Sequence, residues 1–137
     1  MIFTKNRLIV LSGISILSGC ANITLPVLTP PAPPITIKES VSQICKEADE
    51  NQVRANQYYN GKTLTITGEV ASVNELFNPR YRIYMIAGKK LRIHASTENQ
   101  AYAMKLTNGK QATVTGVIQN LTYDHNGCSI SLKDAHF

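Results

Sequence analysis

Asn60-Gly61-Lys62-Thr63-Leu64-Thr65-Ile66-Thr67-Gly68-Glu69-Val70 carries a pattern that occurs twice in the chain. The second copy, Asn108-Gly109-Lys110-Gln111-Ala112-Thr113-Val114-Thr115-Gly116-Val117-Ile118, begins 48 positions later. Asn-Gly is a turn or helix-end signal because both residues tolerate positive φ. The alternation of apolar side chains with Thr that follows is typical of a half-buried strand. A glycine inside a strand marks a bulge or a sharp bend. The repeat therefore predicts two bent strands in a small, closed, strongly curved sheet.

Alternating segments that predict further strands lie between and beyond the two copies. The first strand is expected from about Lys62 to Asn74, and a change of apolar parity at Val73 predicts a bulge near Ala71-Ser72. The other strands are expected at residues 80–87 and 91–95, over the second copy of the repeat to about Leu121, and at residues 128–133.

Two helices are also expected. Apolar residues at spacings of three and four predict an N-terminal helix from Thr36 to Tyr58 or Tyr59, with Thr36 and Glu39 as a capping box. A short helix, capped by Thr97 and Gln100 and ending at Leu106, should join strands three and four. The resulting order is that of an OB-fold, a mainly β, five-stranded barrel with a helix between strands three and four. The N-terminal helix is an addition to it.

The N-terminus has the features of a secretory signal. Lys5 and Arg7 precede an apolar run that is too short to span a bilayer, which takes about 20 residues. Leu17-Ser18-Gly19-Cys20 resembles the lipobox of bacterial lipoproteins, which implies cleavage after residue 19 and lipidation of Cys20. An ordinary signal peptide or a short anchor helix is the alternative. Since Ala21 rather than Asp follows the cysteine, resemblance to Gram-negative sorting favours the periplasmic face of the outer membrane.

A linker is expected to separate the lipid from the folded domain. Residues 20–35 hold five of the six prolines, a composition that favours an extended spacer. The domains are thus a signal peptide at 1–19, the lipidated cysteine and linker at 20–35, and the OB-fold domain at 36–137. Removal of the signal takes away two cations and lowers the net charge from +5 to +3. That mild excess does not by itself indicate a nucleic-acid partner.

The chain has three cysteines. With Cys20 assigned to the lipid, Cys45 and Cys128 remain as an even pair in an oxidising compartment, which predicts a disulfide. A bond across so long a loop would stabilise the fold by roughly 4 kcal/mol in the entropic description. Two buried free thiols are the alternative. Neither cysteine belongs to a Cys-x-x-Cys or Cys/His cluster, so the pair is not expected to bind a metal.

The sequence also resembles a known family. Asp49-Glu50-Asn51, Ala55, Tyr58-Tyr59-Asn60-Gly61-Lys62 and Thr65-Ile66-Thr67-Gly68-Glu69-Val70 are similar to the tRNA-anti-like OB-fold family of bacterial secreted proteins and lipoproteins. The second copy of the repeat resembles the fourth strand of that family, and the resemblance covers roughly residues 40 to 135. Its motifs are turns, bends and core positions, so it implies a fold and no catalytic residue. A protein outside the cytoplasm does not meet tRNA, and nucleic acid is not expected as a partner.

Residues 79–94 carry five cations and no acidic residue. The strand register points five side chains of strands two and three away from the core, and we call them the basic face: Arg80, Arg82, Tyr84, Arg92 and His94. OB-folds bind oligonucleotides and oligosaccharides across the face formed by these strands. Cations interleaved with a tyrosine suit an anionic or stackable ligand. The alternative is a solvated basic surface without a ligand.

Metal and catalytic sites find less support in the sequence. His94, His125 and His136, together with Met85 and Met104, invite comparison with periplasmic OB-fold copper carriers, because Cu(I) favours Met and His. However, Met85 has the parity of a core residue, and no Met-x-Met is present. No metal site and no cofactor are therefore expected. The chain contains neither Gly-x-Ser-x-Gly nor His-Glu-x-x-His, and it is not expected to be an enzyme.

These observations predict a membrane-anchored envelope lipoprotein with a non-catalytic OB-fold binding module. Its ligand would be an anionic envelope component or a partner protein. The alternatives are a periplasmic copper carrier and a DNA-binding or entry-blocking surface lipoprotein.

Overall fold

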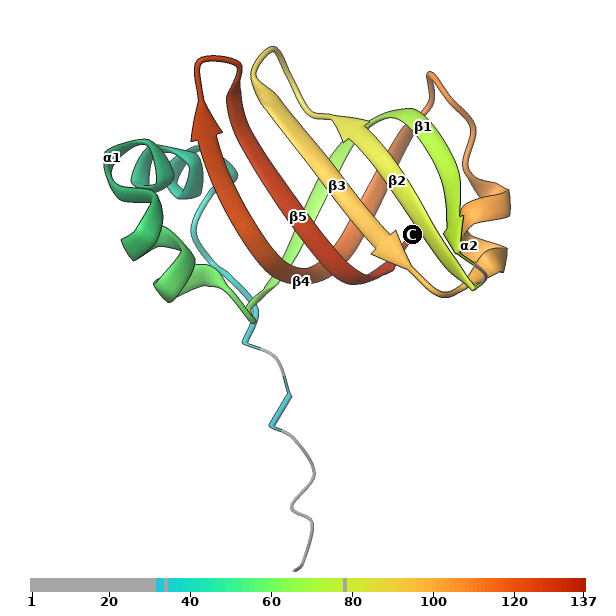
Figure 1. Ribbon diagram of the computed structural model, residues 1–137, viewed down its shortest axis with the longest axis horizontal. Coiled ribbons are helices and arrows are strands. Elements are labelled where there is room, and N and C mark those ends of the chain that lie inside the picture. Colours follow the sequence, from blue (N-terminus) through green and yellow to red (C-terminus); the bar gives the residue numbers. More distant parts are fainter. Residues whose placement is uncertain (1–31, 34, 78) are drawn as a thin grey trace, which may run out of the picture. The chain divides into compact units, whose positions relative to one another are not determined.

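Five strands close into a barrel in the order β1-β2-β3-β5-β4 (Figure 1). The strands are β1 (Thr63–Phe77), β2 (Arg80–Ile86), β3 (Leu91–Thr97), β4 (Gln111–Asp124) and β5 (Gly127–His136). Neighbouring strands are antiparallel except β3 and β5, which pair in parallel. The helices are α1 (Val41–Tyr59), before β1, and α2 (Gln100–Lys105), between β3 and β4. The predicted fold class, a mainly β OB-fold with an additional N-terminal helix, is confirmed.

The computed structural model describes residues 32–33, 35–77 and 79–137. The predicted signal peptide, the lipidation site Cys20 and all but three residues of the predicted linker lie outside the described residues. Residues 32–137 form one compact unit with its own hydrophobic core. None of the helices in the described ranges is sufficiently long and apolar to traverse a bilayer.

The two copies of the repeat are the strands that change partner as the barrel closes. The first half of β1 pairs with β4 and its second half with β2, while the second half of β4 pairs with β5. Gly68 and Gly116 lie where partner strands approach closely. A Cβ atom on Gly68 would lie 2.9 Å from the carbonyl oxygen of Ile86, and one on Gly116 would lie 3.0 Å from the Cβ of Leu132. The bulge predicted near Ala71-Ser72 is confirmed by a register shift between Val70 and Ser72.

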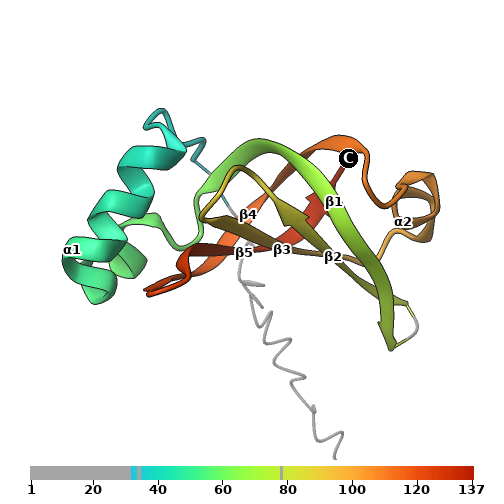
Figure 2. The ribbon, with the colours of Figure 1, turned by 90° about the horizontal axis from the view of Figure 1, so that it is seen from above.

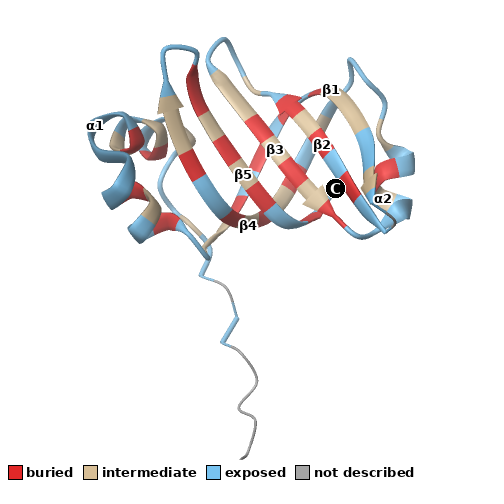
Figure 3. Cartoon of the chain, in the orientation of Figure 1, coloured by how far each residue is buried: buried red, intermediate tan, exposed pale blue. Residues whose placement is uncertain are grey.

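Apolar side chains point inward at alternate positions of the strands, in β1 as far as Val70, and fill the barrel. Met85 is fully buried among them, as its parity predicts. Figure 3 shows how buried residues alternate with more exposed ones along the strands. Burial of the apolar side chains of one face is what fixes the register, since a slip of one residue would turn each of them toward water. The outward positions of the same strands are consequently also fixed.

Helix α1 begins five residues later than predicted, so the capping box of Thr36 and Glu39 is wrong. Ser40 is the N-cap, and its Oγ accepts a hydrogen bond from the backbone N–H of Gln43 at 3.2 Å. Thr36 instead forms a parallel β-bridge with Thr63. A backbone pairing with a residue far along the chain therefore decides where this helix starts.

Two different anchors hold α1 against the barrel, one on each side of a break at Asn51. Asn51 has non-helical φ and ψ, and its Oδ1 accepts a hydrogen bond from the N–H of Arg54 at 3.0 Å. The predicted disulfide joins Cys45, in the first half, to Cys128 on β5, with 5.6 Å between the Cα atoms. In the second half, the Asn56 amide donates to the carbonyl oxygen of Leu121 and accepts from its N–H, both at 2.7 Å.

Helix α2 lies at the opposite end of the barrel from α1 (Figures 1 and 2). Its N-cap is Asn99, whose Oδ1 accepts from the N–H of Tyr102, so the predicted cap pair of Thr97 and Gln100 is wrong. Thr97 is buried at the end of β3, and its hydroxyl accepts from the N–H of Asn99 at 3.1 Å. The strand thus extends two residues further than the pattern indicates.

Candidate binding face

The basic face lies on the outside of β2 and β3, as the alternation predicts. Tyr84 and His94 are direct partners across the two strands, and their ring centroids are 5.0 Å apart with a 37° angle between the planes. Arg82 is exposed one pair away from them, opposite Ser96. Because Ile83, Ile93 and their inward neighbours are fully buried, these outer side chains have no other face to occupy.

The three arginines of the basic face differ in their partners. Arg80 lies 3.6 Å from a Glu98 oxygen, and Arg92 lies 3.3 Å from an Asp124 oxygen. Arg82 forms no ion pair within the described residues. Both carboxylates lie outside the acid-free segment 79–94, Glu98 just after β3 and Asp124 at the end of β4. The composition of the segment therefore does not show that the charge of the face is partly compensated. The Arg80–Glu98 pair is exposed on both sides, and pairs of this kind contribute about 0–1 kcal/mol, so a ligand can compete with it.

His94 is half-buried between two cations. Burial lowers the pKa of His94 below its ordinary value of 6.5, and the charges of Arg82 and Arg92 lower it further. Both effects disfavour the imidazolium form. At neutral pH, His94 therefore contributes an uncharged ring beside Tyr84, and the positive charge of the face resides on the arginines.

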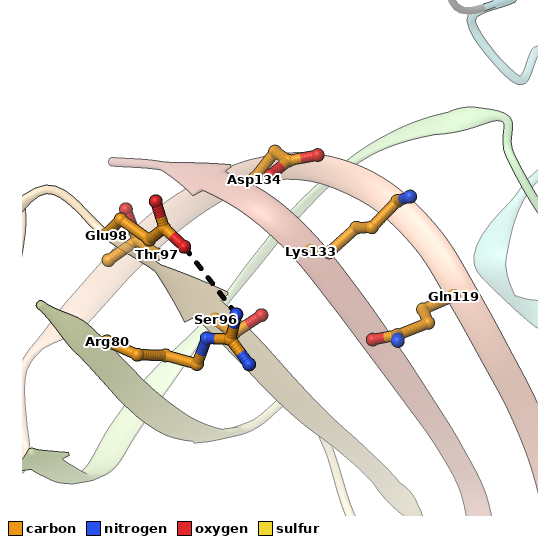
Figure 4. A pocket seen from close by; sticks show the side chains of 7 residues that line it. All are labelled: Arg80, Ser96, Thr97, Glu98, Gln119, Lys133 and Asp134. Carbon is orange, nitrogen blue, oxygen red and sulfur yellow. Dashed lines mark ion pairs between the residues drawn. The ribbon is translucent and has the colours of Figure 1, made fainter. Parts of the chain in front are cut away.

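Two adjoining depressions extend the face from β3 toward β5 and β4. The larger, of about 340 Å³, is lined by residues that include Arg82, His94 and Ser131. The smaller, of about 160 Å³, is lined by charged and polar groups that include Arg80 and Lys133. Ser96 and Gln119 belong to both. Figure 4 shows the Arg80 guanidinium near Ser96 on one side of the smaller depression, with Lys133 and Gln119 on the other side.

The polar residues of this surface that were not among the predicted site residues include Gln119, Ser129, Ser131 and Lys133. The sequence indicates the position of all but Gln119, because the other three have outward parity on the fifth predicted strand. A bulge in β5 at Asp134, which has a φ of 52°, could not be foreseen from the pattern. Lys133 lies opposite Val117, between the register shift at this bulge and an earlier one at Ile118/Asn120, and it lines the smaller depression.

The three histidines lie on separate elements. His94 is on β3, His125 is in the turn after β4 with its Nε2 3.0 Å from the Asn126 amide, and His136 ends β5 near the Tyr102 ring. Among residues 32–33, 35–77 and 79–137, no group of three His, Cys, Asp or Glu side chains is placed to hold a metal ion. The three histidines therefore do not form one such group.

Comparison with known proteins identifies the family. Residues 1–125 match the model of the tRNA_anti-like family. The chain belongs to the tRNA_anti-like family. The resemblance stated from the sequence is thus confirmed, and the barrel is the OB-fold module of that family.

No curated protein matches the tRNA_anti-like chain. Among solved structures, it is similar to a protein of Klebsiella pneumoniae that is named as a nucleic acid-binding lipoprotein. That likeness has a TM-score of 0.56 at 20% identity and covers 74% of this chain and 89% of the other. A second likeness, to OBody AM3L09 in its complex with hen egg-white lysozyme, has a TM-score of 0.42 at 11% identity and covers 57% and 82%. At 20% identity, the first likeness shows a shared fold.

Proposed function

We propose that this tRNA_anti-like protein is a lipid-anchored envelope protein that binds an anionic ligand, without catalysis, across its basic face. The observation that carries the proposal is Arg82. It is an exposed guanidinium without an ion pair in the described part of the chain, beside the Tyr84–His94 ring pair and at the edge of a depression of about 340 Å³. Guanidinium groups bind phosphate and carboxylate in a bidentate geometry, so this side chain is suited to an anion.

The neighbouring groups have complementary roles in the proposed site. The Tyr84 and His94 rings offer a surface against which a planar or apolar part of the ligand can pack. The Ser131 hydroxyl and the Gln119 amide line the depression and can donate hydrogen bonds to ligand oxygens, whereas the Ser96 hydroxyl donates to the carbonyl oxygen of Leu132 at 3.2 Å. Arg80 and Arg92 would contribute less, because each must exchange a carboxylate partner for the ligand.

The envelope location rests on the Leu17-Ser18-Gly19-Cys20 lipobox, and the Klebsiella protein of the same fold is also a lipoprotein by name. We place the protein at the periplasmic face of the outer membrane, tethered through Cys20. Cells fed an acyl-chain analogue should label the native protein and leave a Cys20→Ser variant unlabelled. Labelling of the variant would disprove this anchor without affecting the proposal for the basic face.

The binding proposal is tested by titrating the protein with lipopolysaccharide, a sulfated glycan and a neutral glycan. We expect the two anions to bind and the neutral glycan not to bind. Arg82→Ala should weaken anion binding about tenfold, since hydrogen bonds to charged groups contribute roughly 1.5–3 kcal/mol. Arg54→Ala is the matched control, because Arg54 is an exposed arginine on α1 that pairs with Glu50. Equal affinities of the two variants would refute the proposal.

Single-stranded nucleic acid is a second candidate ligand, favoured by the Tyr84–His94 ring pair. Bases stack on aromatic side chains while cations follow the phosphates, and each stacked base contributes about 1–3 kcal/mol. The name of the Klebsiella lipoprotein points in the same direction. An oligonucleotide that binds with a steep decrease in affinity as salt rises, and that loses affinity on Tyr84→Ala, would favour this ligand over an envelope anion.

A further inference from the structure

A second concave site lies between the first half of α1 and the barrel. This groove has a volume of about 530 Å³, and its lining shares no residue with the two depressions of the basic face. We call it the helix groove. Its walls come from α1 on one side and from residues beside the β2–β3 and β4–β5 turns on the other. Its size is within the range of about 300–1,000 Å³ that is typical of small-molecule sites.

The floor of the helix groove is apolar. Val41, Leu91 and Tyr123 pack against the core on one side and remain partly exposed on the other. The Cys45–Cys128 disulfide lies among them and also lines the groove. The bond holds α1 to β5 at this point, with the two Cα atoms 5.6 Å apart. Covering apolar surface that the fold leaves exposed with an apolar ligand removes that surface from water, which favours binding.

Charged groups around this floor are mainly cationic. Lys46 and Lys90 line the groove with one carboxylate, that of Asp49. The Lys46 amine lies 3.9 Å from Glu50, which is outside the lining, whereas Lys90 forms no ion pair within the described residues. The backbone carbonyl of Lys90 accepts a hydrogen bond from the N–H of Cys128 at 2.8 Å, so the residue is fixed at the edge of the groove. An apolar floor beside an uncompensated amine matches a ligand with an apolar chain and a negative end.

We propose that the helix groove binds an aliphatic carboxylate. The hydrocarbon chain would lie over Val41, Leu91 and Tyr123, and the carboxylate would pair with Lys90. This site is independent of the basic face, so failure of either proposal leaves the other intact.

The test uses the purified full-length protein and a photoreactive analogue of decanoate. After cross-linking, mass spectrometry should locate the label on residues that line the groove, and unmodified decanoate should compete for it while decanol competes poorly. Lys90→Ala should weaken binding about threefold to fivefold, the range expected for a partly exposed ion pair. Lys89→Ala, which changes the exposed neighbour outside the lining, should leave it unchanged.

Val41→Ser tests the apolar floor against Val53→Ser, a strongly exposed valine of the same helix that lies outside the groove. The first variant should reduce labelling and the second should not. Label scattered over the surface, or equal effects within each matched pair, would overturn the proposal. Equal competition by decanol would overturn the carboxylate assignment. Lys90→Ala changes a side chain outside the core, so its result decides the matter even if Val41→Ser proves unstable.

Discussion

The barrel has two polar outer faces, and they differ in whether their polar side chains have partners within the sheet. On β1 and β4, the hydroxyls of Thr65 and Thr115 lie 2.8 Å apart, and those of Thr67 and Thr113 lie 2.7 Å apart. We call these four residues the threonine face. On β2 and β3, Arg82 has no ion pair within the described residues, and Arg80 and Arg92 are matched only by exposed carboxylates.

This difference distinguishes a structural surface from a candidate binding surface. Cross-strand threonine pairs satisfy each other and stabilise the sheet by roughly 0.2–1 kcal/mol each, so the threonine face does not require a ligand. It arises because the same Thr-x-Thr motif occurs in both copies of the repeat, which meet as neighbouring strands. On the basic face, the Tyr84 and His94 rings pair across the strands, whereas the Arg82 guanidinium has no ion-pair partner among the described residues. Four predictions test this contrast, beginning with the largest effect.

Loss of the disulfide should destabilise the whole barrel and leave the contrast between its faces intact. Replacing Cys45 and Cys128 together by Ser should lower the free energy of unfolding by about 4 kcal/mol, measured by urea denaturation. Anion affinity at the basic face, measured where the variant is still folded, should stay within about twofold of the native value, since neither cysteine belongs to that face. A large loss of affinity would mean that α1 contributes to the site.

Gly68→Ala should disturb the closure of the barrel next to the threonine face. The new methyl would meet the backbone oxygen of Ile86 at 2.9 Å, and a backbone atom cannot move aside as a side chain can. Overpacking of this kind costs about 1–3 kcal/mol. Thermal unfolding should show the decrease. An unchanged melting temperature would show that β1 and β2 can separate at this point without cost.

Removing the threonine pairs should have a smaller effect on stability and none on binding. The double variant Thr67→Ala/Thr113→Ala should lower the free energy of unfolding by at most about 1 kcal/mol, because it removes both partners of one pair at an exposed position. Anion affinity should equal that of the native protein. Weaker anion binding would show that the threonine face belongs to the ligand site and would abolish the distinction between the faces.

His94 should make the stability of the fold and the affinity for anions depend on pH in opposite directions. Its pKa in the folded protein is lowered below 6.5, so the unfolded chain binds the proton first as the pH falls through 6.5. Stability therefore decreases between 6.5 and the lowered pKa, and is fully present above that window. A bound anion favours the imidazolium, so affinity should increase over the same range, by no more than about fivefold. His94→Gln should remove both trends, whereas a trend that persists must come from another group.

Much of the fold is encoded in local patterns. The Thr-x-Thr-Gly repeat predicted β1 and β4, and the parity change at Val73 predicted the bulge in β1. The start of α1 could not be predicted locally, because Thr36 is engaged by Thr63 and the capping role passes to Ser40. The break at Asn51 was also missed, since no apolar position changes its face there.

The candidate site was partly predictable for a similar reason. Alternation alone places Arg82, Tyr84 and His94 on one surface. The carboxylates of Glu98 and Asp124 were missed because neither belongs to the two strands of the basic face: Glu98 follows the end of β3, and Asp124 is the last residue of β4. The depressions also depend on the parallel pairing of β3 with β5, which joins segments more than 30 residues apart. No periodicity within one strand carries that information.

The parallel bridge ahead of α1 has a mechanical consequence. The N–H of Ile37 donates to the carbonyl of Thr63 at 2.9 Å, and the N–H of Thr63 donates to the carbonyl of Ile35 at 2.8 Å. Tension on the chain before residue 35 is therefore transmitted directly to the beginning of β1. Helix α1 lies in the chain between the two segments that these hydrogen bonds join. A pulling force therefore passes from residue 35 to Thr63 without acting along the helix, and the helix can keep its position under load.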